Sequence, residues 1–428
     1  MYLTLSRSHF AALSAVVFLS ACSAGDMPKT LAGPVSESPI TVEGAHASAA
    51  PLPAPILAET TRPARTPRRG VITAGDIDDG LNLAAFVAYQ RAAAGRLGLP
   101  RANLARPVTA QLVGPNGKPA PGVHVTLRKP GATKPFYNGY SGVDGMVTVF
   151  PAVLGAGRPA TVELRAFGTG QDPSVRTLKA GAGRQRVQLP QASDWQPEFL
   201  DLAIVLDTTG SMGDELAWLT KELRGIVNAA RKSAPGVDIR YALVVYRDDG
   251  DAYVVRNRGF TKSAAQMTRW LRKQSANGGG DYPEAAAKAL ASGAALNWRR
   301  GKGERWMFHI ADAPAHDRDA RAYLAAAQVA AGKNVQIFGL GASGVAAKSE
   351  FLMRQAAVQT GGRYMFLTDD SGVGNGHVEP TISCYRVTKL RDLMIRVLRS
   401  ELSGHRQEAA AGQVVRSVGS YRDGVCQN

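Results

Sequence analysis

The hydrophobic pattern of residues 198–403 predicts an α/β domain. Short runs that are apolar almost throughout alternate there with segments whose apolar residues recur at helical spacing; the runs include DLAIVL, YALVVY, RWMFHIA, VQIFGLG and RYMFL. Strands of this kind are typical of a parallel sheet that helices cover on both faces. The pattern therefore predicts a doubly wound, mostly parallel sheet.

Residues 106–192 show a different pattern, in which short alternating runs such as GVHVTLRK and ATVELRAFG are separated by turn signals such as PNGKP and GVDG. This pattern predicts an all-β sandwich with antiparallel strands. The segments NGKPAPGVHVTL and SGVDGMVTVFPAV resemble the carboxypeptidase regulatory-like sandwich, which implies a spacer or binding module. Residues 76–105 predict a short helical segment without an assigned role, and residues 404–428 a C-terminal tail.

The N-terminus has the form of a secretion signal over residues 1–21. Its apolar stretch, FAALSAVVFLS, is too short to span a membrane. The LSAC sequence that ends at Cys22 resembles a bacterial lipobox, which implies a lipidated Cys22, and Ser23 resembles the outer-membrane sorting pattern. An ordinary signal peptide is the alternative. Residues 22–75, rich in proline and alanine, predict a disordered tether.

The overall charge adds a second functional possibility. The chain carries 51 Lys and Arg against 35 Asp and Glu, a formal charge of +16, which favours anionic partners. An envelope location argues against nucleic acid, so the alternative is a basic surface that binds anionic envelope polymers without metal. Cys384 and Cys426 are the cysteines left after Cys22, and either one disulfide or two unpaired thiols fit an oxidising envelope.

Side chains with oxygen atoms lie in three loops of the α/β region, directly after a predicted strand or at the start of a predicted helix. Asp207, Thr209 and Ser211 follow the first strand of the α/β region, Glu284 follows three glycines, and Asp312 follows the strand RWMFHIA. Ligands of parallel sheets bind at the carboxyl ends of the strands. Helix capping would need only one such oxygen, whereas several converging oxygens suit Mg²⁺ or Ca²⁺.

The motifs DTTGSM, GGGDYPE and HIADAPAH, in this order, resemble a von Willebrand factor A domain with a metal-ion-dependent adhesion site. The family pattern D-x-[ST]-x-S implies Asp207, Thr209 and Ser211 as ligands, with Asp312 as a further one. Glu284 stands where many members have threonine and resembles the integrin β version. The resemblance implies a bound Mg²⁺ or Ca²⁺ and a protein partner whose carboxylate completes the coordination, or an envelope glycan.

Other acidic residues resemble the flanking Ca²⁺ sites of integrin β domains. They are Asp214, Glu215, Asp281 and Asp248. The alternative is that these acids only stabilise helix starts through the helix dipole. Three carboxylates at the central site also make a bound cation less electrophilic, so capture of an acidic partner should be weaker unless positive charge compensates.

An enzymatic alternative would use Asp207 as the nucleophile of a phosphohydrolase. DTTGS resembles the D-K-T-G-T motif of ion-pumping ATPases, but Thr208 replaces the lysine. A phosphatase of the same fold would want a second aspartate where Thr209 stands. The sequence therefore predicts a non-catalytic, lipid-anchored binding protein of the bacterial envelope, associated with the outer membrane.

Overall fold

A computed structural model describes residues 71–168, 172–193, 195–280, 282–342, 345–371 and 380–427. Every described residue belongs to one compact unit of the chain. The predicted signal peptide, Cys22 and most of the predicted tether lie outside the described residues. Within the described ranges, the helices are too short or too polar to cross a membrane.

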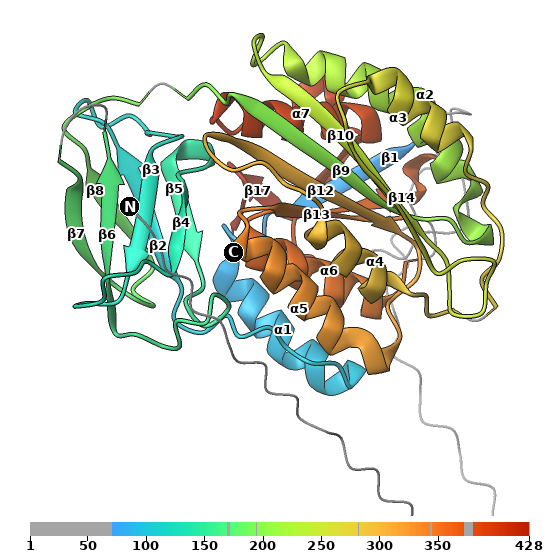
Figure 1. Cartoon of the computed structure of the whole chain (residues 1–428), viewed down its shortest axis with the longest axis horizontal. Helices are drawn as coiled ribbons and strands as arrows, with labels where there is room; N and C mark the ends of the chain where they lie inside the picture. The colour runs from blue at the N-terminus through green and yellow to red at the C-terminus, as the bar shows by residue number, and fades with distance from the viewer. Residues whose placement is uncertain are drawn as a thin grey trace, which may run out of the picture. The chain divides into compact units, whose positions relative to one another are not determined.

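A nine-stranded mixed sheet forms the centre of the α/β part (Figure 1). Its five central strands, β10, β9, β12, β13 and β14, run parallel, and the outer pairs are antiparallel. The fold-class prediction is thereby confirmed. In spatial order the strands are β11 (Val255–Thr261), β10 (Asp238–Tyr246), β9 (Phe199–Asp207), β12 (Gly303–Ala311), β13 (Gln336–Gly341), β14 (Tyr364–Thr368), β1 (Thr73–Ile77), β15 (Tyr385–Lys389) and β16 (Arg416–Val418).

Helices cover both faces of this sheet. One face carries α2 (Gly213–Arg231), α3 (Ala264–Arg272) and α7 (Leu390–Ser403), and the other carries α1 (Leu83–Leu97), α4 (Ala286–Ala295), α5 (Ala320–Gly332) and α6 (Ala347–Thr360). Leu219, Leu223 and Ile226 recur at helical spacing on α2 and are buried against the sheet. Each face therefore has its own apolar core, as a doubly wound sheet requires.

The sheet extends beyond the predicted range of 198–403 on both sides. β1 lies between β14 and β15 and is antiparallel to both, and β16 pairs with β15. Just after β1, Asp79 accepts two hydrogen bonds of 2.8 Å from Arg354 of α6, which also donates to Glu350. The segment 76–105 thus supplies α1 and the end of β1, and the first three residues of β1 belong to the stretch predicted to be a disordered tether.

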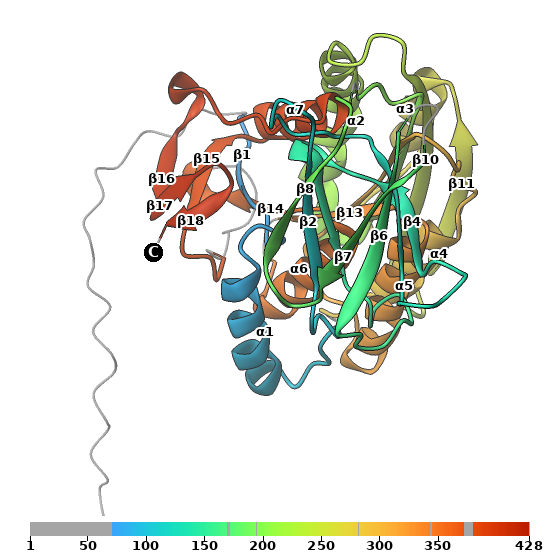
Figure 2. The ribbon, with the colours of Figure 1, turned by 90° about the vertical axis from the view of Figure 1, so that its left-hand side faces the viewer.

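Residues 108–188 form two small sheets around one apolar core (Figure 2). The strands pair antiparallel as expected, except for β2 and β8, which are parallel. The chain crosses from one sheet to the other between β7 and β8, so β8 is not joined to β2 by a hairpin and can run in the same direction. The likeness to a carboxypeptidase regulatory-like sandwich stays a prediction. The strands are β2 (Val108–Val113), β3 (His124–Arg128), β4 (Tyr137–Tyr140), β5 (Met146–Val149), β6 (Thr161–Phe167), β7 (Ser174–Lys179) and β8 (Arg184–Gln188).

The C-terminal residues fold back onto the sheet. A short hairpin of β17 (Ser420–Arg422) and β18 (Val425–Gln427) follows β16. Cys384, just before β15, and Cys426, in β18, are joined by a disulfide with a Cα–Cα distance of 5.5 Å. This link ties the hairpin to the strand beside β1.

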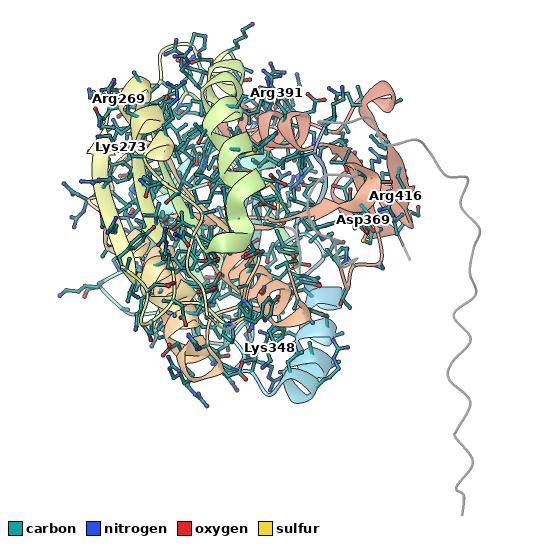
Figure 3. All side chains as sticks on the ribbon, turned by 90° about the vertical axis from the view of Figure 1, so that its right-hand side faces the viewer. Arg269, Lys273, Lys348, Asp369, Arg391 and Arg416 are labelled. Carbon is teal, nitrogen blue, oxygen red and sulfur yellow. A yellow bond between two sulfur atoms is a disulfide. The ribbon has the colours of Figure 1, made fainter. Side chains whose placement is uncertain are left out.

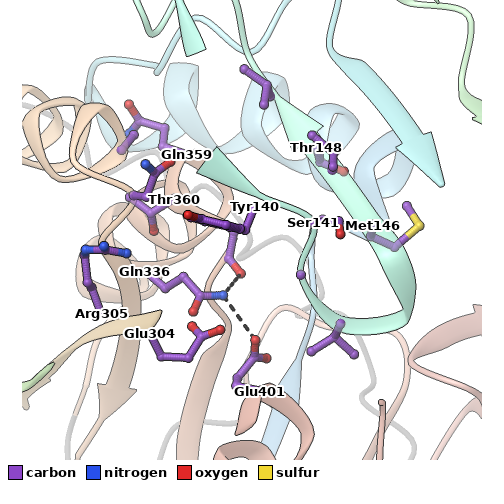
Figure 4. A pocket seen from close by; sticks show the side chains of 18 of the residues that line it. Tyr140, Ser141, Met146, Thr148, Glu304, Arg305, Gln336, Gln359, Thr360 and Glu401 are labelled. Carbon is purple, nitrogen blue, oxygen red and sulfur yellow. Dashed lines mark hydrogen bonds between the residues drawn. The ribbon is translucent and has the colours of Figure 1, made fainter. Parts of the chain in front are cut away.

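A polar cavity of about 210 Å³ lies at the amino end of β12 (Figure 4). Glu304 and Glu401 line it, and Gln336 donates a 3.2 Å hydrogen bond to Glu401. Burial, and next the charge of Glu401, raise the pKa of Glu304 from 4.5 to about 8; Arg305 and a hydrogen bond from Trp306 oppose them. Between pH 4.5 and about 8, Glu304 is therefore mostly protonated in the folded protein and mostly ionised in the unfolded chain.

The replacement Glu304→Gln is expected to stabilise the protein in alkaline solution. Because the folded-state pKa of Glu304 exceeds its unfolded value, stability is lost as pH rises from 4.5 through about 8. Glutamine lacks this penalty, so the melting temperature should rise by about 2 °C or more near pH 8.5 and change less near pH 4.5. Calorimetric melting at both pH values measures the difference; an equal shift at both would contradict the assignment.

Candidate metal centre

The first loop of the candidate site begins where β9 ends. All nine residues of β9 are buried, and the last is Asp207. The Oδ1 atom of Asp207 accepts hydrogen bonds from the backbone N–H of Thr209 at 2.9 Å and from its hydroxyl at 2.8 Å. The hydroxyl of Thr209 thus donates its proton to Asp207, and its lone pairs remain available to a ligand.

The second loop, before α4, is held against the first by backbone hydrogen bonds. Gly210 donates to the carbonyl of Gly278 at 3.1 Å, and Asn277 donates to the carbonyl of Thr208 at 3.1 Å. Gly279 has a φ of +80°, and a Cβ atom there would lie 2.9 Å from Oε1 of Glu284 and 3.1 Å from Cβ of Thr209. Glycine at this position therefore lets the two loops approach closely.

The third loop follows β12 and completes the convergence. Glu284 donates its backbone N–H to the carbonyl of Pro314 at 2.9 Å and forms an isolated parallel bridge with Ala315. Ser211 lies close enough to Asp312 to oppose the rise in the pKa of that carboxyl. The structure thus brings Asp207, Thr209, Ser211, Glu284 and Asp312 together at the carboxyl edge of the sheet.

Three carboxylate oxygens in this cluster are buried without a hydrogen-bond partner: Oδ2 of Asp207, Oε2 of Glu284 and Oδ1 of Asp312. Buried polar atoms nearly always find a partner. One unpaired oxygen from each of three loops is therefore the arrangement expected where a cation supplies the missing interaction.

The electrostatics of the cluster point the same way. Burial chiefly raises the pKa of Asp207 to about 7, and the charge of Asp312 adds to it. The pKa of Glu284 rises to about 9 through burial and then through the charges of Asp207, Asp248 and other carboxylates. Burial likewise raises the pKa of Asp312. The cluster thus lacks positive charge from the protein, which a divalent cation would supply.

The carboxylates alone do not form a complete coordination shell. Among the described residues, His, Cys, Asp and Glu side chains do not gather in groups of three close enough to hold a metal ion. Hydroxyl and water oxygens are also normal ligands of Mg²⁺ and Ca²⁺. The donor set therefore fits a cation only with Thr209, Ser211 and water included.

The predicted flanking residues have different surroundings. Asp214 is exposed and Glu215 is buried in the first turn of α2, while Asp281 lies outside the described residues. Asp248 is buried and pairs with His316, whose Nε2 lies 2.6 Å from its Oδ1. A flanking ion that used this Oδ1 of Asp248 would compete with His316.

Three further residues shape the site, and the sequence motifs did not predict a role for them. Asp251 accepts hydrogen bonds from the backbone N–H groups of Asp248 at 3.1 Å and Gly279 at 2.9 Å. The hydroxyl of Tyr246 forms a 3.0 Å hydrogen bond with Nε2 of His309 and lies close enough to Asp207 to oppose the rise in its pKa. Tyr282 is 48% exposed, and its hydroxyl donates to the carbonyl of Asp312 at 3.2 Å. Position is the signal for two of them, because Tyr246 ends β10 and Asp251 follows it at this edge of the sheet, whereas Tyr282 lies in the loop before α4.

Comparison with known families agrees with this geometry. The sequence profile of the von Willebrand factor A domain matches residues 201–373. This segment is a von Willebrand factor A domain. The match begins in β9 and includes all three loops of the cluster, so the predicted family is confirmed, and we refer to the segment as the A domain.

Individual relatives share only parts of the chain. An ariadne-like RING finger protein of Acanthamoeba polyphaga mimivirus is 36% identical over 90 residues, 21% of this chain and 9% of its own length. An alpha-protein kinase of Dictyostelium discoideum is 28% identical over 123 residues, 28% of this chain and 19% of its own length. The chain therefore spans about a fifth or less of these curated relatives.

Solved structures also resemble parts of the chain. BatB from Bacteroides thetaiotaomicron aligns over 42% of this chain and 91% of its own, with 16% identity and a TM-score of 0.31. The pilus adhesin SpaC from Lactobacillus rhamnosus GG aligns over 47% of this chain and 30% of its own, with 12% identity and a TM-score of 0.31.

Proposed function

We propose that the protein is a non-catalytic binding protein whose A domain recognises its partner through a divalent cation, Mg²⁺ or Ca²⁺. The observation that carries the proposal is the set of three unpaired, buried carboxylate oxygens on Asp207, Glu284 and Asp312. They come from three loops at one edge of the sheet, where ligands of such sheets bind.

The candidate ligands of the A domain would contribute two kinds of oxygen to such an ion. Asp207, Glu284 and Asp312 supply negative charge, and the hydroxyls of Thr209 and Ser211 supply neutral oxygens. Thr209 donates to Asp207, so this bond orients that carboxylate, and Ser211 lies close to Asp312. When bound, the cation would supply a Lewis-acid position that accepts an oxygen of the partner.

The partner chemistry follows from this arrangement. A carboxylate on a protein partner is the preferred class, and an oxygen-rich envelope glycan is the second. The exposed ring of Tyr282 stands beside Asp312 and offers an apolar surface next to the ion. We further propose that a lipid on Cys22 anchors the protein at the outer membrane of a bacterial envelope, which the apolar stretch and the LSAC sequence support.

Isothermal titration of the metal-stripped full chain with Mg²⁺, and separately with Ca²⁺, tests the proposal. Saturable binding of at least one ion and a rise in melting temperature at saturation are expected, because a ligand that binds only the folded state stabilises it. Absence of saturable binding by both ions would overturn the proposal. Retention of a partner from envelope extract with the ion, and its release by EDTA, would then identify the partner.

A further inference from the structure

A second groove lies on the helical face of the chain that carries α1 and α5 (Figure 1). Its volume is about 660 Å³, which is within the range of about 300–1,000 Å³ that is usual for small-molecule sites. The third helical turn of α1, the segment 99–105, a loop of the β-sandwich and the start of α5 line it. None of the cation-site residues belongs to it.

Four arginines line this groove, and no acidic residue does. They are Arg91, Arg101, Arg158 and Arg321, all exposed. Within the described ranges, none of the four has an ion-pair partner. Four formal positive charges thus border one concave surface without compensation.

Other surface cations of this chain have acidic partners, and two of these cations, Lys348 and Arg391, are labelled in Figure 3. Lys348 pairs with Asp317 at 2.6 Å, and Arg391 pairs with Glu222 at 3.0 Å. A groove between α2 and α3 has three cations and a smaller volume of about 330 Å³, whereas the groove beside α1 gathers the four arginines that lack an ion-pair partner among the described residues. They mark a local field that favours anions.

Part of the groove's lining is apolar, and the segment 99–105 is fixed in place by hydrogen bonds. Leu99 and Leu104 are buried there. The side-chain oxygen of Gln355 accepts 2.8 Å hydrogen bonds from the backbone N–H of Ala102 and from Gln90. These bonds hold the segment 99–105 against α1 and α6, so the groove exists before a ligand arrives and little ordering entropy is lost on binding.

We propose that this groove binds a soluble organic ligand that carries two or more phosphate groups, such as a phosphorylated saccharide. The planar guanidinium fork of arginine matches phosphate oxygens two at a time. Four cations without an acid nearby suit a ligand with several negative charges better than a single carboxylate. The buried leucines suit a carbon skeleton, and the concave shape suits a discrete ligand better than a flat bilayer.

Titration of the full chain with pyrophosphate in metal-free, resin-treated buffer tests this proposal. Saturable binding is expected, and it should weaken as salt rises from about 50 to 200 mM, because exposed charges are screened. The double variant Arg91→Gln/Arg321→Gln should bind about tenfold or more weakly. Absence of binding by the wild type, or equal binding by this variant, would overturn the proposal.

The matched control is Arg184→Gln/Arg258→Gln, which removes the same charge from exposed positions of β8 and β11 outside the groove. It should bind pyrophosphate as the wild type does, and a loss equal to that of the first variant would show only general attraction and defeat the proposal. Equal melting temperatures for the three proteins show that folding is intact. Vesicles of anionic phospholipid form the last arm: vesicle binding that needs Arg91 and Arg321, without pyrophosphate binding, would assign the groove to a membrane surface instead.

Discussion

Replacing Asp207 with asparagine is expected to abolish the saturable Mg²⁺ or Ca²⁺ binding of the A domain. Asp207 places one unpaired carboxylate oxygen in the cluster while its other oxygen accepts two hydrogen bonds from Thr209. Asparagine keeps the shape but removes the charge, and it can still accept from Thr209. At an ion concentration about 100 times its dissociation constant, the wild type should gain about 2.7 kcal/mol of stability, and the variant should gain none.

Two observations separate this result from simple misfolding. Without a cation the carboxylates of Asp207 and Asp312 repel each other, so metal-free Asp207→Asn should melt at least as high as the wild type. Asp249→Asn is the matched control, because Asp249 lies in the nearby β10–β11 turn and pairs with Lys288 and Arg318. A variant at position 207 that still binds the ion would refute the proposed site.

Adding a single methyl group at Gly279 is expected to damage both the fold and the site. The φ of +80° disfavours alanine, and the new Cβ would lie 2.9 Å from Oε1 of Glu284 and 3.1 Å from Cβ of Thr209. The strained backbone should cost about 1–3 kcal/mol of unfolding free energy. Displacement of Glu284 should lower the affinity for the ion by about tenfold or more, as is usual when residues that orient a metal ligand change.

The neighbouring Gly280 provides the control for this prediction. A Cβ atom at Gly280 would meet no atom within 4 Å, and its backbone does not have a positive φ. Gly280→Ala should therefore change stability and ion affinity little. Denaturant unfolding and metal titration of both variants measure the contrast, and equal effects would mean that loop flexibility matters more than the close approach at Gly279.

The sequence was sufficient to predict the sheet and the edge where the candidate residues meet. β9 is apolar from Leu202 to Leu206 and then ends at a polar residue, so its burial and its carboxyl end are both visible in the sequence. Asp207 and Asp312 each follow directly from such a strand. Converging loops could thus be expected before any contact was known.

β1 could not be recognised in the same way, because its stability comes from distant residues. Its sequence, TAGDI, has no hydrophobic alternation, yet all five residues are buried. Asp76 is tolerated there because Arg396 binds it at 2.9 Å. Gly75 packs so closely on Phe366 that a Cβ would lie 2.6 Å from the ring. Neither partner is near in sequence, so local patterns carry no signal for this strand.

The position of β1 has a consequence for how the protein can be dissected. β1 precedes the β-sandwich in the chain but lies between β14 and β15 of the large sheet. The sandwich is therefore inserted into the chain between two strands of that sheet, β1 and β9. A recombinant fragment cut at residue 201 would leave two strands with open edges, which favour aggregation. The sandwich, by contrast, enters after α1 and leaves before β9, so it can be exchanged or deleted with a short linker while every strand of the large sheet is kept.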